Sequence, residues 1–349
     1  MLVTKHAVFR RFWYPVLPAE DLADGPKPFT LLGTELVLWR DAQGAPAAAL
    51  DRCCHRSAKL SRGFCEDGNI VCGYHGWTFN RTGQCVRVPQ FDEPHRRNGF
   101  KVPAYRCQER YGYVWVALDE PLYDIPEIPE AAEPGFRRIH QFYEVWECVG
   151  LRLMENSFDI AHPAFVHRKT FGIQSDPSIT IADLTAFDGG FHYKVESNVR
   201  NTEIQKKNLQ MATEVTQRKR TNTWWMPFVR RLGITYPNGL RHTIITAATP
   251  IDDRRSMLVQ FCYRNDTEAD AKAADIVAFD REVTLEDKYI LEGTEPDVLL
   301  SGYAETEKSM ASDRPGLLMR RMIRELLARH GEFEAAPAED DVMAGEAAE

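Results

Sequence analysis

The chain has 349 residues, 44% hydrophobic and 27% charged, which is ordinary for a folded protein and long enough for two domains. A net charge of −8 and a pI near 5.8 argue against nucleic acid or an anionic membrane as a partner. The sequence has no run of about 20 apolar residues and its start lacks the apolar core of a signal peptide, so we expect a cytoplasmic protein without a membrane anchor.

The first 120 residues have the pattern of a mostly β domain. Residues 28–50 predict two short strands around a turn at 41–44, where the sequence reads DAQG. Further strand-like segments, separated by Gly, Asn or Pro, lie at 69–72, 76–80, 84–89 and 111–119. A stretch rich in proline and acidic residues follows at 119–135, so we expect a first domain over 1–120 and a linker over 121–140.

The rest of the chain combines helices with a long β region. The predicted helices lie at 146–162, 275–293 and 315–332, and the predicted strands at 191–199, 221–229 and 240–252. We therefore expect an α+β protein whose second domain covers 141–332. Residues 333–349 have little to bury and predict a disordered tail.

Two short loops each combine cysteine with histidine. The pattern is C-x-H, sixteen residues, then C-x-x-H, formed by Cys53, His55, Cys72 and His75. Cysteines in a chain this long and without a secretion signal indicate metal binding rather than a disulfide framework. The residues leave two alternatives open, a zinc knuckle and ordinary core cysteines. Glycines at 63, 73 and 76 favour an iron–sulfur cluster, because they let backbone N–H groups approach its sulfides.

The whole stretch from 53 to 89, CCHRSAKLSRGFCEDGNIVCGYHGWTFNRTGQCVRVP, resembles the Rieske signature. The resemblance implies a 2Fe-2S cluster with Cys53 and Cys72 on one iron and the two histidines on the other. Neutral imidazoles in place of thiolates raise the reduction potential of such a cluster. Cys54 is then a spacer, because it adjoins His55 and cannot form C-x-H.

A second group of polar residues lies in ENSFDIAHPAFVH, residues 155–167. Asn156, Asp159 and His162 are spaced by three, so a helix would place them on one face. His167 follows five residues later, about 140° away on an ideal helix, and Pro163 favours a break that turns it back. The alternative is a helix end with surface histidines. Two histidines would be part of a facial triad for non-haem iron, which also needs one carboxylate.

The missing carboxylate should lie on a buried helix face. In 275–293 an apolar stripe at helical spacing consists of Ile276, Phe279, Val283, Ile290 and Leu291. Asp287 falls inside this stripe and Glu286 beside it. A buried aspartate needs a partner, and iron would serve. The alternative is an intramolecular salt bridge.

These residues resemble the N-x-x-D-x-x-H-x-x-x-x-H element and the late helix of Rieske non-haem iron oxygenases, from about residue 11 to 330. The resemblance implies that His162, His167 and Asp287 bind mononuclear Fe(II). It implies that Asp159 is the bridge to the Rieske cluster of a neighbouring subunit in a homotrimer, and that Asn156 lies near the iron. The implied catalytic domain is a helix-grip, START-like fold, with an antiparallel sheet wrapped over a long helix.

Three segments, 51–63, 221–229 and 248–253, look like the small homotrimeric branch of caffeine and dicamba demethylases and saxitoxin hydroxylases. That branch implies O2-dependent monooxygenation, by hydroxylation or by N- or O-demethylation, of a cyclic aromatic or heterocyclic molecule. An NAD(P)H-dependent reductase, with or without a ferredoxin, would supply the electrons. Two alternatives stay open, a ring cis-dihydroxylating dioxygenase and a non-catalytic Rieske electron-transfer or redox-sensing protein.

The substrate-binding residues stay open at this point. An aromatic cluster could line a pocket but is more often core, and comprises Trp224, Trp225, Met226, Phe228 and Tyr236. Carboxylate-binding candidates are Arg218, Arg220, Arg230, Arg231 and Arg241, most of which we expect to be solvated.

Overall fold

The computed structural model describes residues 1–90, 99–176, 181–296, 298–301 and 307–334, and the chain divides into two compact units. The smaller unit comprises Phe9–Ile125 and Thr249–Asp252, and the larger comprises Met1–Val8, Pro126–Ala248 and Asp253–Glu349. The domain limits that the sequence predicts, at 120 and 140, stay predictions. The predicted tail over 333–349 lies outside the described residues from position 335 onward.

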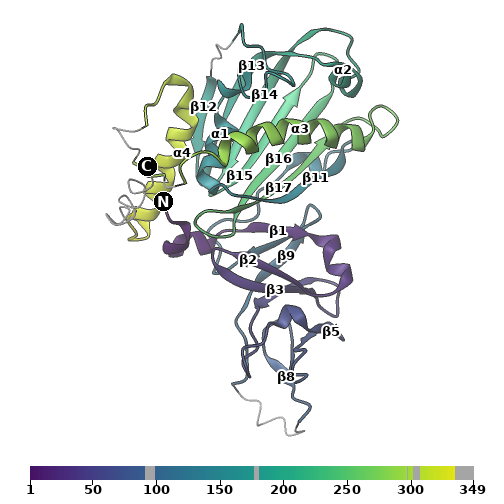
Figure 1. Ribbon diagram of the computed structural model, residues 1–349, viewed down its shortest axis with the longest axis vertical. Coiled ribbons are helices and arrows are strands. Elements are labelled where there is room, and N and C mark those ends of the chain that lie inside the picture. The colour runs from purple at the N-terminus through teal and green to yellow at the C-terminus, as the bar shows by residue number, and fades with distance from the viewer. Residues whose placement is uncertain (91–98, 177–180, 297, 302–306, 335–349) are drawn as a thin grey trace, which may run out of the picture. The chain divides into compact units, whose positions relative to one another are not determined.

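Strands dominate the smaller unit, as the sequence predicts (Figure 1). An antiparallel sheet has the order β1-β10-β9-β4-β3-β2 and consists of β1 (Tyr14–Pro18), β2 (Lys27–Leu31), β3 (Thr34–Arg40), β4 (Pro46–Leu50), β9 (Ala104–Arg110) and β10 (Tyr113–Ala117). A second sheet follows the chain order and consists of β5 (Phe64–Glu66), β6 (Asn69–Val71), β7 (Thr78–Phe79) and β8 (Cys85–Arg87). Of the cysteine–histidine pairs, the first lies between β4 and β5 and the second between β6 and β7.

The prediction of two strands in 28–50 is wrong, because this stretch contains three. The turn at Asp41 forms as expected, since the Asp41 carboxylate accepts the N–H groups of Gln43 and Ala45 at 3.0 and 2.9 Å. A second turn lies between β2 and β3, where Leu32 and Gly33 have φ of 48° and 73°. Two positive φ values suit a tight hairpin, but leucine rarely adopts one, so the sequence carries no signal for this turn.

The larger unit is built on a seven-stranded antiparallel sheet in the order β11-β17-β16-β15-β14-β13-β12. Its strands are β11 (Arg137–Trp146), β12 (Ile181–Phe187), β13 (Gly190–Arg200), β14 (Val215–Trp225), β15 (Val229–Thr235), β16 (Arg241–Pro250) and β17 (Ser256–Arg264). Burial alternates along β14, where Thr216, Arg218, Arg220, Asn222 and Trp224 are buried. This inward row therefore mixes polar and charged side chains with one aromatic residue.

Helix α3 (Ala273–Leu291) lies across one face of this sheet (Figure 1). The other α-helices are α1 (Gly150–Phe158), α2 (Glu203–Leu209) and α4 (Arg314–Arg329). Ile276, Phe279 and Leu291 of the predicted stripe are buried, but Ile290 is 46% exposed, so the stripe is narrower than predicted. An antiparallel sheet covered by a long helix confirms the predicted α+β arrangement.

Short 3-10 helices occupy the connections: η1 (Val3–Lys5), η2 (Ala7–Arg11), η3 (Ala19–Asp24), η4 (Leu60–Arg62), η6 (Pro129–Ala131), η7 (His162–Ala164) and η8 (Ala311–Asp313). The proline-rich stretch at 119–135 contains only one of them, η6, which agrees with the predicted connection. Among the described residues, every helix is too short or too polar to cross a membrane.

Candidate metal centres

The two cysteine–histidine loops of the smaller unit share one backbone design. Cys53 follows β4 and Cys72 follows β6. The carbonyl of Cys53 accepts the N–H of Ser57 at 3.0 Å, and that of Cys72 accepts the N–H of Gly76 at 2.9 Å. Each cysteine N–H also bonds across its own loop at 2.8 Å. Both loops are therefore tight turns that begin at a cysteine.

In these loops the two cysteine side chains lie next to each other, and so do the two histidine rings. Cys53 and Cys72 are only 2% and 1% exposed, and their thiols are hydrogen-bonding neighbours. The rings of His55 and His75 lie 4.5 Å apart between centroids. In the described part of the chain, the groups with three ligand atoms within 4.8 Å of one another do not include these four residues. Separate sulfur and nitrogen pairs suit a cluster of two unlike irons, whereas one zinc ion needs all four ligands around it.

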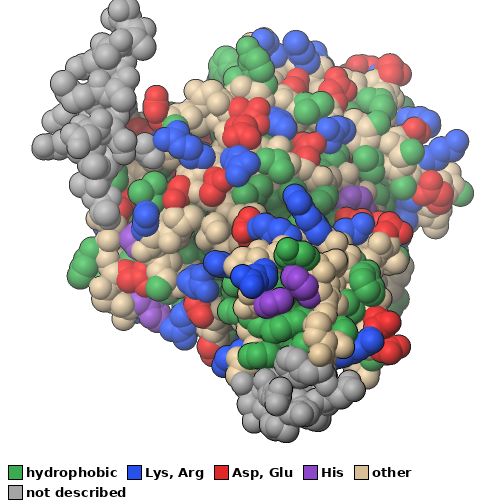
Figure 2. Space-filling model, turned by 60° about the horizontal axis from the view of Figure 1, so that its bottom comes forward, with side chains coloured by type: hydrophobic (Ala, Val, Ile, Leu, Met, Phe, Trp, Pro, Cys, Tyr) green, Lys and Arg blue, Asp and Glu red, His purple; other side chains and the backbone are tan. Residues whose placement is uncertain are grey.

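The chemistry of the thiols also fits a cluster. Burial raises the pKa of the Cys53 thiol to about 12, and the charge of the neighbouring Cys72 adds to the rise. A buried thiol of this kind becomes a thiolate only beside strong positive charge, which iron supplies. His55 is exposed and stacks on the ring of Trp77 at 4.5 Å. Figure 2 shows histidines at the surface of the molecule among basic and hydrophobic side chains.

Gly63 and Gly73 lie where the segment after η4 passes close to the Cys72 loop. A Cβ atom at Gly63 would lie 1.9 Å from the carbonyl oxygen of Val71, a distance too short for any residue with a side chain. A Cβ atom at Gly73 would lie 3.0 Å from the carbonyl oxygen of Arg62. These glycines therefore let the segment after η4 pack closely against the backbone around Cys72.

Replacement of Cys53 by alanine should bleach the purified protein and remove its acid-labile sulfide and its reduced Rieske EPR signal. One of four ligands is then lost, and the neighbouring buried thiol cannot replace it. Cys54→Ala is the matched control, because Cys54 is exposed and should leave colour, sulfide and signal unchanged. Bleaching by Cys54→Ala but not by Cys53→Ala would show that the ligand register is shifted by one residue.

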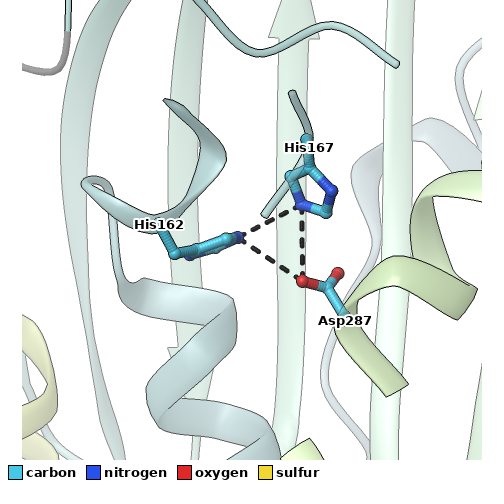
Figure 3. Close-up of side chains that lie close together, drawn as sticks. All are labelled: His162, His167 and Asp287. Carbon is cyan, nitrogen blue, oxygen red and sulfur yellow. Dashed lines mark hydrogen bonds and ion pairs between the residues drawn. The ribbon is translucent and has the colours of Figure 1, made fainter. Parts of the chain in front are cut away.

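A second centre lies in the larger unit, where three side chains from separate parts of the sequence lie close together (Figure 3). His162 Nε2 lies 3.2 Å from His167 Nε2, and the Asp287 Oδ1 atom lies 3.6 and 3.3 Å from these two nitrogens. Ligands on one octahedral face are about 3 Å apart when metal–nitrogen bonds are about 2.1 Å long. The three atoms therefore have the spacing of a facial triad.

The carboxylate of Asp287 is oriented to bind a metal ion. Its Oδ1 atom is buried and accepts no hydrogen bond, which is expensive for a charged oxygen unless a cation lies beside it. Two histidines and one carboxylate with open positions opposite them are typical of non-haem Fe(II). The residues present therefore fit mononuclear iron.

Glu286 holds His167 in place, a role that the sequence interpretation missed. Its Oε2 atom lies 3.0 Å from His167 Nδ1 and accepts the hydroxyl of Thr170 at 2.8 Å. A carboxylate on Nδ1 fixes the ring and leaves Nε2 free for the metal. Burial lowers the pKa of His167, which favours the neutral ring that a metal requires. The only sequence signal was a carboxylate adjacent to Asp287, which we interpreted as a competing ligand.

The predicted common helix face for Asn156, Asp159 and His162 is wrong. Helix α1 ends at Phe158, and Asp159 has extended backbone angles (φ −64°, ψ 131°), before η7 begins at His162. The break thus lies four residues before Pro163. The buried hydroxyl of Tyr193 donates to the carbonyl of Phe158 at 3.0 Å and fixes this end of the helix.

Asp159 nevertheless lies beside His162. Its Oδ1 atom accepts the N–H of Ala161 at 2.7 Å, and its Oδ2 atom lies 3.7 Å from His162 Nδ1. Burial raises the pKa of Asp159, but His162 outweighs burial and holds this pKa below its usual value. Asn156 lines the same cavity as the triad but is not one of the three residues of the triad.

The triad faces a cavity of about 150 Å³ between α3 and the sheet. A cavity of this size accommodates one benzene ring. Of the five aromatic-cluster candidates, Tyr236 lines it, whereas Trp224 and Phe228 are 0% and 1% exposed core residues. The cavity therefore suits a small ring compound, but its wall is more polar than that cluster suggested.

Comparison with known families agrees with both centres. Residues 12–106 match the Rieske [2Fe-2S] domain. Residues 146–329, more than half of the chain, match the vanillate O-demethylase oxygenase C-terminal domain. The first match contains the cysteine–histidine loops and the second contains the triad.

Individual proteins are similar over most of the chain. Methylxanthine N1-demethylase NdmA of Pseudomonas putida is 28% identical over 333 residues, 93% of this chain and 90% of the relative. The structure of that protein with caffeine superposes with a TM-score of 0.79, covering 93% of each chain at 28% identity. The oxygenase component of dicamba O-demethylase from Stenotrophomonas maltophilia is 34% identical over 46% of this chain and 48% of its own. The chain belongs to the Rieske non-haem iron oxygenases, with a 2Fe-2S domain followed by a catalytic domain of the vanillate O-demethylase type.

Proposed function

We propose that this oxygenase hydroxylates a C–H bond of a cyclic small molecule, and removes a methyl group when that carbon is bonded to nitrogen or oxygen. The observation that carries the proposal is the facial arrangement of His162, His167 and Asp287 toward a ring-sized cavity. Relatives named as an N-demethylase and an O-demethylase support the reaction type.

In this proposal Cys53, His55, Cys72 and His75 hold the 2Fe-2S cluster, and His162, His167 and Asp287 hold Fe(II). When bound, the cluster supplies electrons and the Fe(II) centre binds and activates O2. The three side chains would hold the ion from the protein side, and all three line the cavity in which a substrate would lie. Glu286 keeps His167 oriented, and Phe279 and Val283 form an apolar part of the cavity wall.

The reaction balances as one substrate, one O2, two electrons and two protons giving one hydroxylated product and one water. A hydroxylated N- or O-methyl group then breaks its bond to the heteroatom and leaves as formaldehyde, while the heteroatom takes the proton. Electrons come from a reductase or ferredoxin partner, as the multicomponent nature of these oxygenases requires. We propose an NAD(P)H-dependent reductase as their source.

We also propose that the chain acts as a homotrimer in the cytoplasm. The support is Asp159, whose carboxylate is fixed by the N–H of Ala161 and lies next to a candidate iron ligand. In the proposed trimer, Asp159 connects that ligand to the cluster of a neighbouring subunit. The proposal has a direct check in the molar mass of the purified oxygenase by light scattering.

Turnover in 18O2 distinguishes the candidate reactions. We expect reduced holoenzyme with a surrogate reductase to release formaldehyde from an N- or O-methylated ring compound, and to place one 18O atom in a hydroxylated product. Two 18O atoms in a cis-diol would indicate a dioxygenase. About two irons per chain in place of three, without any oxygenated product, would indicate an electron-transfer protein.

A further inference from the structure

The partners of the five candidate arginines separate them into two groups. Arg231 Nε lies 3.1 Å from one oxygen of Glu130, its Nη2 binds the other oxygen, and Arg241 lies 3.5 Å from that second oxygen. Glu130 is buried, so both cations are neutralised within the protein. These two arginines do not serve a ligand.

Arg218 and Arg220 have no such partner. They lie two residues apart on β14, so both point to the inner face of the sheet, and they are 5% and 8% exposed. Among the described residues, neither guanidinium has a hydrogen-bond acceptor or an ion pair, and the Arg218 Nε and the Arg220 Nε and Nη2 atoms are buried. Buried charged donors without acceptors are costly, which indicates a ligand that supplies acceptors.

Both arginines line the cavity that the triad faces. The Arg218 guanidinium lies 4.6 Å from the centre of the Phe171 ring, and that ring stacks on His167 at 4.8 Å. One aromatic ring therefore separates this cation from an iron ligand. An anion on the arginines would belong to the molecule that reacts at the metal.

The charges of the cavity wall do not cancel. Arg230 is a third cation, held by the amide oxygen of Asn222 at 3.1 and 2.7 Å, and a fourth, Arg264, is paired with Asp266. Asp280 lies on the same wall, where Gln141 donates to it, His242 lies 3.5 Å away, and the charges of Arg264 and Arg218 act on it without a direct ion pair. Burial raises the pKa of Asp280 to about 6.

The remaining carboxylates, Asp159 and Asp287, belong to the metal site. The arginine side of the cavity therefore carries excess positive charge. Burial, together with the charge of Arg218, lowers the pKa of Arg220 to about 9. Burial destabilises the charged form of this guanidinium group, so an anionic ligand beside it would be favoured.

We propose that the substrate is a single-ring compound bearing a carboxylate, which Arg218 and Arg220 bind while the ring lies beside the triad. This inference rests on the proposed oxygenase function and adds the charge and the size of the substrate. A planar guanidinium matches a carboxylate with two parallel hydrogen bonds. A neutral ring would leave both guanidinium groups unpaired, so the site should discriminate strongly against it.

Anaerobic calorimetry on the holoenzyme tests the inference with anisole and with ortho-, meta- and para-methoxybenzoate. We expect at least one methoxybenzoate to bind about 100-fold more tightly than anisole, because charge-assisted hydrogen bonds replace unpaired donors. Methoxybenzenesulfonate separates a planar from a tetrahedral anion, and should bind less tightly than the best carboxylate. Inorganic sulfate should compete only weakly, since it leaves the ring space empty.

Arg220→Met should abolish the preference for the carboxylate while keeping the volume of the side chain. Arg220→Lys keeps the charge but lacks the planar pair of N–H donors, and should retain part of the preference for the carboxylate. Lys219→Met is the matched control, because Lys219 is the exposed neighbour on the opposite face of β14, and should bind like the unaltered protein. Without ligand, Arg220→Met should unfold at the same or a higher temperature, because it removes a buried unpaired charge.

Equal affinity for anisole and the acids, binding of neither, or a preference that survives Arg220→Met would overturn the inference. So would sulfate binding as tightly as the ring acids. The proposed oxygenase function fails separately: acids that bind as expected but release no formaldehyde contradict demethylation, whereas turnover of neutral rings alone contradicts the charged substrate.

Discussion

Asp287→Ala should lower the iron content to about two atoms per chain, those of the cluster, and abolish oxygenation. The two remaining imidazoles lie 3.2 Å apart and lack the third ligand that completes a facial triad. Iron analysis with acid-labile sulfide as the internal reference measures this loss, and the visible spectrum of the cluster should stay unchanged. The cluster residues lie far from Asp287 in the sequence, in the other compact unit.

Glu286→Gln is the matched control for this variant, since it changes the adjacent carboxylate. The amide oxygen can still accept from His167 Nδ1, so three irons and most of the activity should persist. Glu286→Ala removes the acceptor and should weaken iron binding by roughly 10–100-fold, with full occupancy restored by added Fe(II). Loss of the third iron in Glu286→Gln and its retention in Asp287→Ala would transfer the ligand role to Glu286.

Asp159→Asn should keep three irons per chain and reduce turnover by roughly 100-fold or more. The amide is uncharged and interacts more weakly with the Nδ1 side of the His162 ring than the carboxylate does, so the connection between the two centres is weakened. Stopped-flow mixing of the reduced enzyme with O2 and substrate gives the direct measurement. The cluster should remain reduced in the variant after the unaltered enzyme has reoxidised.

Asp159→Glu provides the comparison, because it keeps the charge and changes only the reach of the carboxylate. Partial recovery of the reoxidation rate in this variant would support the relay. Normal cluster reoxidation in Asp159→Asn, whatever the final yield of product, would exclude it.

The sequence predicts which residues form the triad better than it predicts the secondary structure around them. His162, His167 and Asp287 meet as the spacing suggested, yet the helix ends at Phe158 and leaves Asp159 outside it. Its end is fixed by Tyr193, 35 residues further along the chain, whose hydroxyl donates to the carbonyl of Phe158. A contact of this kind leaves no mark in the local pattern.

The missed elements have a similar cause. All nine residues of β17 are buried, so the alternation that identifies a half-exposed strand is absent. Ile290 is apolar but 46% exposed, and hydrophobicity alone placed it in the stripe of α3. The partners of the arginines also depend on pairing across the sheet, since Glu130 lies about a hundred residues before Arg231. The sequence offered five arginines as carboxylate-binding candidates and predicted most of them to be solvated, but it could not show that Arg218 and Arg220 are buried and unpaired.

The inward row of β14 has a consequence for isomer selectivity. The arginines are part of a sheet whose neighbouring strands pair along their length, while Asp287 lies on α3 and the two histidines lie on and after η7. The distance between the charged group and the oxidised carbon is then set by the backbone rather than by flexible loops. Positional isomers of one ring acid should accordingly bind with similar affinity but differ in kcat. Poorly placed isomers should consume reducing equivalents and release hydrogen peroxide instead of product.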